Sequence, residues 1–124
     1  MSELPETLAY TAEHEWVAVG EPATVGITAH AVEELGDIVF VELPGVGDSV
    51  TAGEPCGEIE STKAVSELYA PITGEIVEVN EAVVTAPEKV GQDPYGEGWL
   101  FRIKGDNAET VLLDAAGYRA LITT

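Results

Sequence analysis

Lysine is scarce in this sequence, and one of its three lysines stands where an amine would be most accessible to another protein. Lys63 lies between two β-prone runs, 58–61 and 64–69, so the chain is expected to reverse direction there. A side chain at a hairpin tip projects into solvent and can enter a second protein's active site. Acylating the amine would remove its charge and leave a long, flexible tether. Position alone, however, favours an ordinary solvated lysine.

Other kinds of chemistry find little support among the residue types. Cys56 is the single cysteine, which excludes an internal disulfide or a cysteine metal cluster. Its neighbours indicate that Cys56 is a small apolar residue at the start of a strand. With only two histidines, a conventional metal site is not expected. There is no nucleophile–base pair and no phosphate-binding loop, and Ser61 is interpreted as a turn residue. An enzyme is therefore the least favoured class.

The charge of the chain limits its partners. Five basic residues stand against 23 acidic ones, for a net charge of −18. Such a field repels phosphates and anionic lipid, so neither nucleic acid nor a membrane is expected as a partner. It favours partners with basic docking faces, although solubility alone is an equal interpretation. No apolar run approaches the length of a membrane span, and no secretion signal is visible, so we expect a cytoplasmic protein.

The remaining pattern predicts a mainly β fold. Short β-type runs are separated by glycine and proline at 15–19, 23–28, 38–43, 58–61, 64–69, 74–79 and 99–104. The first two are expected to form a hairpin around 20–22. Gly57-Glu-Ile-Glu before the lysine also resembles Gly74-Glu-Ile-Val-Glu after it, which indicates two similar β-units or a chance match in a glutamate-rich chain. This spacing is typical of a compact sandwich or barrel.

A few short helices complete the prediction. Thr28 is expected to cap a helix over 29–35 that Gly36 ends. A short helical turn is expected at 80–84. Near the end, Asn107 or Thr110 is expected to start a helix that carries Val111, Leu112, Ala115, Ala116 and Leu121. A chain of 124 residues fits a single domain, 1–124.

The sequence around Lys63 identifies the kind of tether. Residues 57–76 resemble the lipoyl-attachment hairpin of the glycine cleavage system H-protein. Further segments similar to this family follow in the expected order: 10–17, 25–28, 35–44, 93–100 and 112–118. Because several ordered motifs are far more specific than one lysine, the resemblance overrides the interpretation of Lys63 as a plain surface residue.

The resemblance implies a lipoyl/biotinyl-type barrel-sandwich hybrid and a non-catalytic carrier, with lipoic acid attached covalently to Lys63. In such a system a pyridoxal-phosphate glycine decarboxylase (P-protein) loads an aminomethyl group onto the arm and releases carbon dioxide. A tetrahydrofolate-dependent aminomethyltransferase (T-protein) takes the one-carbon unit, and dihydrolipoamide dehydrogenase (L-protein) re-oxidises the arm. A lipoyl or octanoyl ligase or transferase is a further implied partner, and a monomer is expected.

The resemblance also implies that Glu15 and His30 shelter the loaded arm in a surface cleft. Glu15 would pair with the amine of the cargo, and His30 would accept a hydrogen bond from it. Two departures stand out. Residues 29–32 lack the acidic and glutamine residues often found beside this helix start. Gly91 replaces a common asparagine, which predicts a looser loop beside the cleft.

Other carriers remain as alternatives. A lipoyl domain of a 2-oxoacid dehydrogenase complex would normally be followed by linkers and an acyltransferase domain. A biotin carrier normally has methionines beside its lysine, where Thr62 and Ala64 stand here. A lipoylation scaffold or relay protein would pass lipoyl groups to other proteins. Growth tests separate it from the carrier: loss of glycine cleavage alone favours the carrier, whereas loss of lipoylated dehydrogenases favours the scaffold.

Overall fold

The computed structural model describes residues 5–18, 20, 22–106 and 112–122. The strands are β1 (Ala9–Tyr10), β2 (Glu15–Ala18), β3 (Ala23–Ile27), β4 (Ile38–Glu42), β5 (Ser49–Val50), β6 (Pro55–Ser61), β7 (Val65–Tyr69), β8 (Thr73–Val79) and β9 (Phe101–Asp106). The helices are α1 (Ala29–Leu35), α2 (Glu81–Thr85), α3 (Glu88–Gln92) and α4 (Ala115–Ile122).

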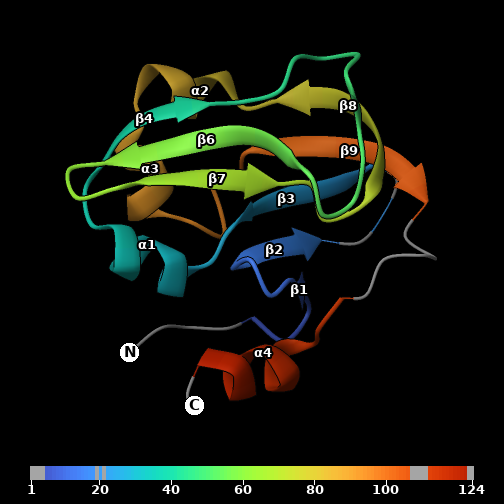
Figure 1. Cartoon of the computed structure of the whole chain (residues 1–124), viewed down its shortest axis with the longest axis horizontal. Coiled ribbons are helices and arrows are strands. Elements are labelled where there is room, and N and C mark those ends of the chain that lie inside the picture. The colour runs from blue at the N-terminus through green and yellow to red at the C-terminus, as the bar shows by residue number, and fades with distance from the viewer. Residues whose placement is uncertain (1–4, 19, 21, 107–111, 123–124) are drawn as a thin grey trace.

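The strands form two antiparallel sheets. One has the order β1-β2-β3-β9-β8-β5, and the other has the order β4-β6-β7 (Figure 1). The predicted first hairpin is confirmed, because β2 pairs with β3. The predicted class is confirmed as well: the fold is mainly β with a few helices, one of them C-terminal. The two sheets face each other without closing into a barrel.

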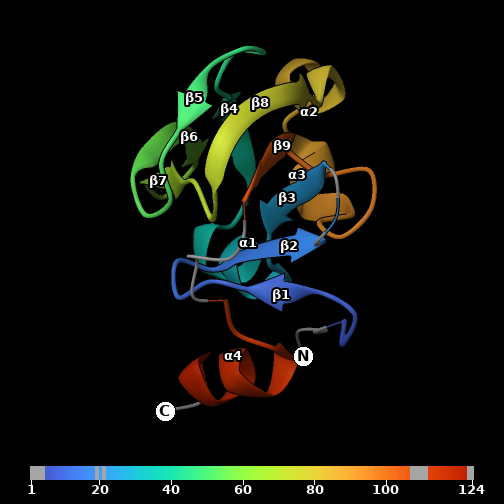
Figure 2. The same cartoon turned by 90° about the vertical axis from the view of Figure 1, so that its right-hand side faces the viewer.

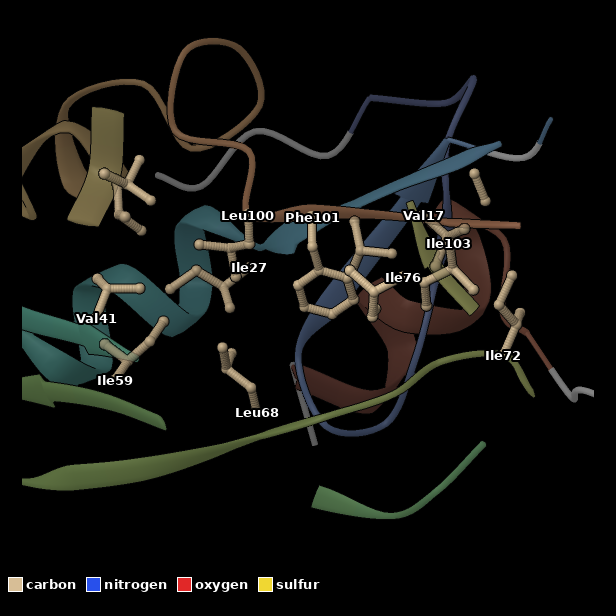
Figure 3. Packing of buried hydrophobic residues seen from close by; sticks show 14 of the residues in the cluster. Val17, Ile27, Val41, Ile59, Leu68, Ile72, Ile76, Leu100, Phe101 and Ile103 are labelled. Atoms are coloured by element: carbon tan, nitrogen blue, oxygen red, sulfur yellow. The ribbon is translucent and has the colours of Figure 1, made fainter. Parts of the chain in front are cut away.

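Alternating apolar residues of both sheets form the main core. Val41 and Ile59 are cross-strand partners in the three-stranded sheet, and both are buried against the six-stranded sheet. Figure 3 shows these side chains and Leu68 facing Ile27, Leu100 and Phe101 from the other layer. Burial of this apolar surface fixes the register of β6 and β7, because a slip of one residue would turn their apolar side chains outward.

A second cluster lies at the end of the molecule where β1 and α4 meet (Figure 2). It contains Tyr10, Trp16, Ala115 and Tyr118, all buried. The Tyr10 and Tyr118 rings are stacked, with centroids 5.0 Å apart. The C-terminal helix is thus packed against the strand that leads into Glu15.

Helix α1 forms as the sequence predicts. The Thr28 side chain accepts a hydrogen bond from the Ala31 N–H, and the Ala29 N–H donates to the Tyr95 hydroxyl at 3.0 Å. Gly36 ends the helix with φ of 84°, a conformation that favours glycine. The chain then enters β4, so α1 ends beside the β6–β7 turn (Figure 1).

The predicted start of the C-terminal helix is wrong. Leu112 was placed in the helix, yet the helix begins at Ala115, and Leu113 instead forms a β-bridge with Tyr10. The Asp114 carboxylate accepts a hydrogen bond from the Gly117 N–H, so this residue acts as the cap. The proposed starts Asn107 and Thr110, and Val111, lie outside the described residues.

The region around 80–92 is more helical than predicted. The expected turn is α2, which Asn80 caps through its side chain. Gly91 was expected in a loop but lies in α3, where a Cβ would meet a Val32 methyl carbon at 3.4 Å. Among the described residues, no helix is long and apolar enough to cross a membrane.

We expect Gly57→Ala to destabilise the lysine hairpin. A Cβ at this position would lie 2.4 Å from the Glu42 carbonyl oxygen of the neighbouring strand, so β4 and β6 would have to separate. The expected loss is about 1–3 kcal/mol in the free energy of unfolding, measured by urea denaturation. Gly91→Ala is the control, because alanine in a helix is neutral or slightly stabilising. Equal stability of the two variants would contradict this account of β4–β6 packing.

Candidate functional site

The turn that carries Lys63 is built by the side chain of Ser61. The Ser61 hydroxyl accepts hydrogen bonds from the Lys63 N–H at 3.1 Å and the Ala64 N–H at 3.0 Å. The Ser61 N–H also donates to the Ala64 carbonyl at 2.8 Å, which closes the hairpin between β6 and β7. The serine that was interpreted as a turn residue therefore shapes the backbone on both sides of the lysine.

Lys63 itself is exposed at this tip. The preceding Thr62 N–H donates to the Asp37 carbonyl at 3.0 Å, which ties the tip to the turn after α1. The aliphatic part of the lysine passes Gly36, since a Cβ on that glycine would lie 3.5 Å from Lys63 Cε. In the described part of the chain, no ion pair involves the Lys63 ammonium. The backbone is held while the amine remains accessible.

A cleft of about 120 Å³ lies between α1 and β7, further along the same hairpin. We call it the α1–β7 cleft. Its lining residues come from α1, from β7, from the segment entering β2, and from the core: Ala31, Glu34, Leu35, Ser66, Glu67, Leu68, Glu13, His14, Glu15, Ile27 and Ile59. The aliphatic lining residues are buried or half-buried, whereas Glu13, Glu34, Ser66 and Glu67 are exposed and Glu15 is buried.

The cleft is within reach of a modified lysine. Ser66 follows Lys63 by three residues along an extended strand, a span of roughly 10 Å, and Leu68 lies at roughly 16 Å. A lysine side chain extended by a lipoyl group spans roughly 14 Å from standard bond lengths. An arm attached at Lys63 can therefore lie along β7 and place its end in the α1–β7 cleft.

Glu15 lies at the inner end of this cleft. Its side chain is buried, with 2% exposed, and its Oε2 accepts a hydrogen bond from the Tyr69 N–H at 2.7 Å. Its Oε1 accepts another from the Thr11 hydroxyl at 3.2 Å. Burial raises the pKa of Glu15 to about 8, against the two hydrogen bonds, which lower it. This carboxyl can therefore hold a proton near neutral pH and give it up to a cationic neighbour.

His14 supplies the wall next to Glu15. Its φ of 67° is the only positive value among the described non-glycine residues. Its Nδ1 lies 2.7 Å from the Tyr118 hydroxyl, and its ring lies 5.1 Å from the ring of His30, centroid to centroid. Burial lowers the pKa of His14, and the neighbouring His30 lowers it further. The imidazole in the wall is therefore neutral at neutral pH.

The structure brings the predicted site residues together only in part. Glu15 reaches the cleft, and Lys63 stands on the hairpin that forms one wall. His30 is on α1 beside His14 but is not among the residues that line the cleft, and its Nε2 lies 3.4 Å from Glu34 Oε1. The histidine that lines the cleft is His14.

Sequence reasoning missed His14, Glu34 and Glu67 as cleft residues. Helical spacing was a usable signal for Glu34, because Ala31, Glu34 and Leu35 share one face of α1. Glu67 lies in the β-prone run after Lys63, but nothing in that run distinguishes a cleft rim from an exposed strand. The orientation of His14 depends on its positive φ and on distant Tyr118, and no local pattern shows either.

The shape and chemistry of the cleft suit a lipoyl arm. Apolar side chains such as Leu35, Ile59 and Leu68 can cover a hydrocarbon chain, while the buried carboxyl of Glu15 meets a small polar or cationic end. Among the described residues, no cluster of His, Cys, Asp or Glu has the arrangement of a metal site.

Comparison with known proteins decides the family. The family described as "Glycine cleavage H-protein" matches residues 8–124. This chain belongs to that family. The glycine cleavage system H protein of Beutenbergia cavernae is 61% identical over 119 residues, covering 95% of both chains. That of Herpetosiphon aurantiacus is 58% identical over 123 residues, covering 98% of this chain and 95% of the relative.

A solved structure agrees with the sequence comparison. A crystal structure of a glycine cleavage system H protein from Mycobacterium marinum has a TM-score of 0.91 at 48% identity. The match covers 98% of this chain and 100% of the other. Membership in the H-protein family implies a lipoyl carrier, a component of the glycine cleavage system.

The raised pKa of Glu15 predicts how stability changes with pH. The folded protein keeps a proton on Glu15 up to about pH 8, whereas the unfolded chain releases it near pH 4.5. The free energy of unfolding should therefore fall as pH rises through this window. Glu15→Gln keeps both hydrogen-bond positions without the charge, so it should remove roughly 3–5 kcal/mol of that fall.

The measurement is urea denaturation of the wild type and Glu15→Gln at several pH values from 5 to 9. Glu13→Gln is the matched control, since Glu13 is exposed and adjacent in sequence. It should keep most of the wild-type slope, because the charge of Glu13 is the smallest of the causes that shift the pKa of Glu15. If Glu15→Gln also kept that slope, Glu15 would have to be ionised in the folded protein throughout, contrary to its burial.

Proposed function

We propose that this chain is the lipoyl carrier of a glycine cleavage system and that Lys63 bears the lipoyl group. The observation that carries the proposal is the position of this amine. Lys63 is exposed on a tip that Ser61 braces, and the strand leaving the tip forms one wall of the α1–β7 cleft. Attachment and shelter are thus provided by one hairpin. The single domain, the monomeric state and the cytoplasmic location remain predictions.

When attached, the lipoyl group supplies a strained disulfide that accepts the aminomethyl group of glycine and later returns as a dithiol. The residues of this chain hold and protect that chemistry. Ser61 keeps the tip in one conformation, so the reach of the arm is set by the arm itself. Leu35, Ile59 and Leu68 cover its hydrocarbon part and keep water from the end of the cleft.

Glu15 receives the amine of the cargo. A cationic amine beside a carboxyl favours its ionised form, so arrival of the cargo would be coupled to loss of the Glu15 proton. The Tyr69 N–H and the Thr11 hydroxyl then hold the carboxylate in place. His14 is the nearer of the two histidines to this position. A direct hydrogen bond from the cargo to His30 stays a prediction.

The partners proposed are glycine decarboxylase, the aminomethyltransferase, dihydrolipoamide dehydrogenase and the enzyme that attaches lipoate. The outer face of the three-stranded sheet supports partners with basic surfaces. Cross-strand pairing places Glu42 beside Glu58 and Glu58 beside Glu67, a row of like charges that costs stability. The next row carries Phe40 and Val65, which are 48% and 58% exposed. A basic partner would offset the repulsion among the glutamates of the first row and cover the apolar side chains of the second.

Lys63→Arg tests the carrier role. The variant should fold with unchanged stability because the side chain is exposed, yet it should accept no lipoyl group and support no glycine cleavage with the three purified partner enzymes. The readouts are intact mass after incubation with ligase and lipoate, and carbon dioxide release from glycine. Lys104→Arg, an exposed lysine on β9, is the control and should behave as wild type. Glycine cleavage by Lys63→Arg would contradict the proposal.

The acidic row makes a separate prediction about docking. The double variant Glu42→Gln, Glu58→Gln should raise the KM of the partner enzymes for the lipoylated carrier about two- to tenfold at low salt, and less at high salt because screening already weakens the contact. Glu75→Gln with Glu88→Gln, on other exposed surfaces, is the matched control. An equal rise in KM for both double variants would mean that net charge, not this face, guides docking.

A further inference from the structure

We infer that Tyr118, on the C-terminal helix, is a positioning residue for the α1–β7 cleft: its hydroxyl holds His14 in the cleft wall and so slows loss of the cargo. The inference rests on the proposed function, because it assumes that the aminomethyl cargo lies at Glu15. It concerns a residue far from Lys63 in sequence and on a different element.

The geometry is a hydrogen-bonded bridge. The Tyr118 hydroxyl lies 2.7 Å from His14 Nδ1 and 2.8 Å from the Thr28 hydroxyl. Thr28 caps α1, which supplies the opposite side of the cleft through Ala31, Glu34 and Leu35. Tyr118 itself is fully buried, so its hydroxyl has exchanged water for these two partners. The bridge therefore connects the segment entering β2 with the start of α1.

His14 needs such a support. Its backbone has positive φ, which is uncommon outside glycine and persists where the surrounding contacts impose it. Two backbone hydrogen bonds contribute: the His14 N–H donates to the Thr11 carbonyl, and the Thr28 N–H donates to the His14 carbonyl. Neither restrains the imidazole. On the side chain, the partner within hydrogen-bond distance is Tyr118, and the ring otherwise meets His30.

The hydroxyl can be separated from the ring that carries it. The Tyr118 ring packs on the Tyr10 ring, and that stacking belongs to the second core cluster. The Tyr10 hydroxyl donates instead to the Pro5 carbonyl at 2.6 Å, and Pro5 does not line the cleft. Tyr118→Phe and Tyr10→Phe each remove one phenol oxygen from the same stack, but only the first removes it from the cleft wall.

The reaction that the cleft wall at His14 slows is hydrolysis of the cargo. Water adds to the aminomethyl carbon, the carbon–sulfur bond breaks, and the sulfur leaves as a thiol after gaining a proton. The carbon departs as formaldehyde and the nitrogen as ammonia, so one water is consumed and no oxidant is needed. A wall that admits water beside Glu15 speeds this loss, whereas attachment of the arm at Lys63 is unaffected.

The first test uses the full, unmodified chain and needs no arm. Nitrogen-15 NMR of the two histidines reports the hydrogen bonding of each ring. Tyr118→Phe should shift the Nδ1 signal of His14 strongly and that of His30 weakly, while Tyr10→Phe should leave both at their wild-type positions. An unchanged His14 signal in Tyr118→Phe would overturn the inference without touching the proposed function.

The second test uses the lipoylated chain, loaded with the aminomethyl group by glycine decarboxylase and then separated from it. Thiol appearance should be about two- to tenfold faster in Tyr118→Phe than in the wild type, the factor that loss of one hydrogen bond gives. Tyr10→Phe should match the wild type, and lipoylation of Lys63 should be complete in both. Absent lipoylation in every variant would instead reject the proposed function.

A double-mutant cycle locates the effect. In a His14→Ala background, Tyr118→Phe should raise the rate of thiol appearance by less than about twofold, because the side chain through which Tyr118 acts is gone. His14→Asn should retain cargo nearly as well as the wild type, since asparagine tolerates positive φ and offers a polar atom near the position of Nδ1. Equal acceleration by Tyr118→Phe in both backgrounds would overturn the inference. If Tyr118→Phe does not fold, faster loss in His14→Ala but not in His14→Asn supports it, and equal loss in both overturns it.

Discussion

The hydrogen bond from the Tyr69 N–H to the Glu15 carboxyl joins the two sheets at the point where the candidate site ends. Glu15 begins β2 of the larger sheet, and Tyr69 ends β7 of the smaller one. Because the carboxyl is buried, loss of this contact would leave a buried polar group without its partner, and β7 runs from it to the turn at Lys63. The exposed tip at Lys63 and the inner end of the cleft therefore lie at the two ends of one strand.

This arrangement meets two opposing requirements of a carrier at two different places on the hairpin. The lysine must stand in solvent to enter several active sites, while the cargo must be kept from water between visits. Ser61 fixes the tip through backbone hydrogen bonds and leaves the Lys63 amine accessible. The cleft lies further along the strand, where Leu68 faces the core. One extended strand thus sets the distance between the exposed tip and the cleft, and an arm attached at Lys63 would supply the motion between them.

The sequence was sufficient for much of this. Alternating apolar residues predict the strands, and Thr28 and Gly36 predict both ends of α1, because caps and periodicity are local properties. The echo around Gly57 and Gly74 also has a physical basis: each glycine lies where a neighbouring strand's carbonyl oxygen would be 2.4 Å from a Cβ. The tip lysine was recognisable only through the motifs around it, since an exposed lysine has no distinguishing physical pattern.

The rest depends on contacts between distant segments. The prediction placed Leu112 in the C-terminal helix, although Leu113 pairs with Tyr10 and the helix begins two residues later at Ala115. His30 was expected in the cleft and His14 was not, because the position of the His14 side chain depends on a positive φ and on the tertiary contact with Tyr118. Burial of Glu15 likewise results from the packing of two sheets, which the sequence of β2 alone does not show.

The most direct test of the account is peptide mapping of the wild-type chain after incubation with a lipoyl ligase and lipoate. Trypsin cuts after lysine and arginine, so the unmodified chain should yield peptides 1–63 and 64–89. A lipoyl group on Lys63 blocks the first cut, and the account predicts one peptide, 1–89, heavier by a single lipoyl group. Complete cleavage after Lys63, with the added mass on Lys89 or Lys104 or on no lysine, would contradict it.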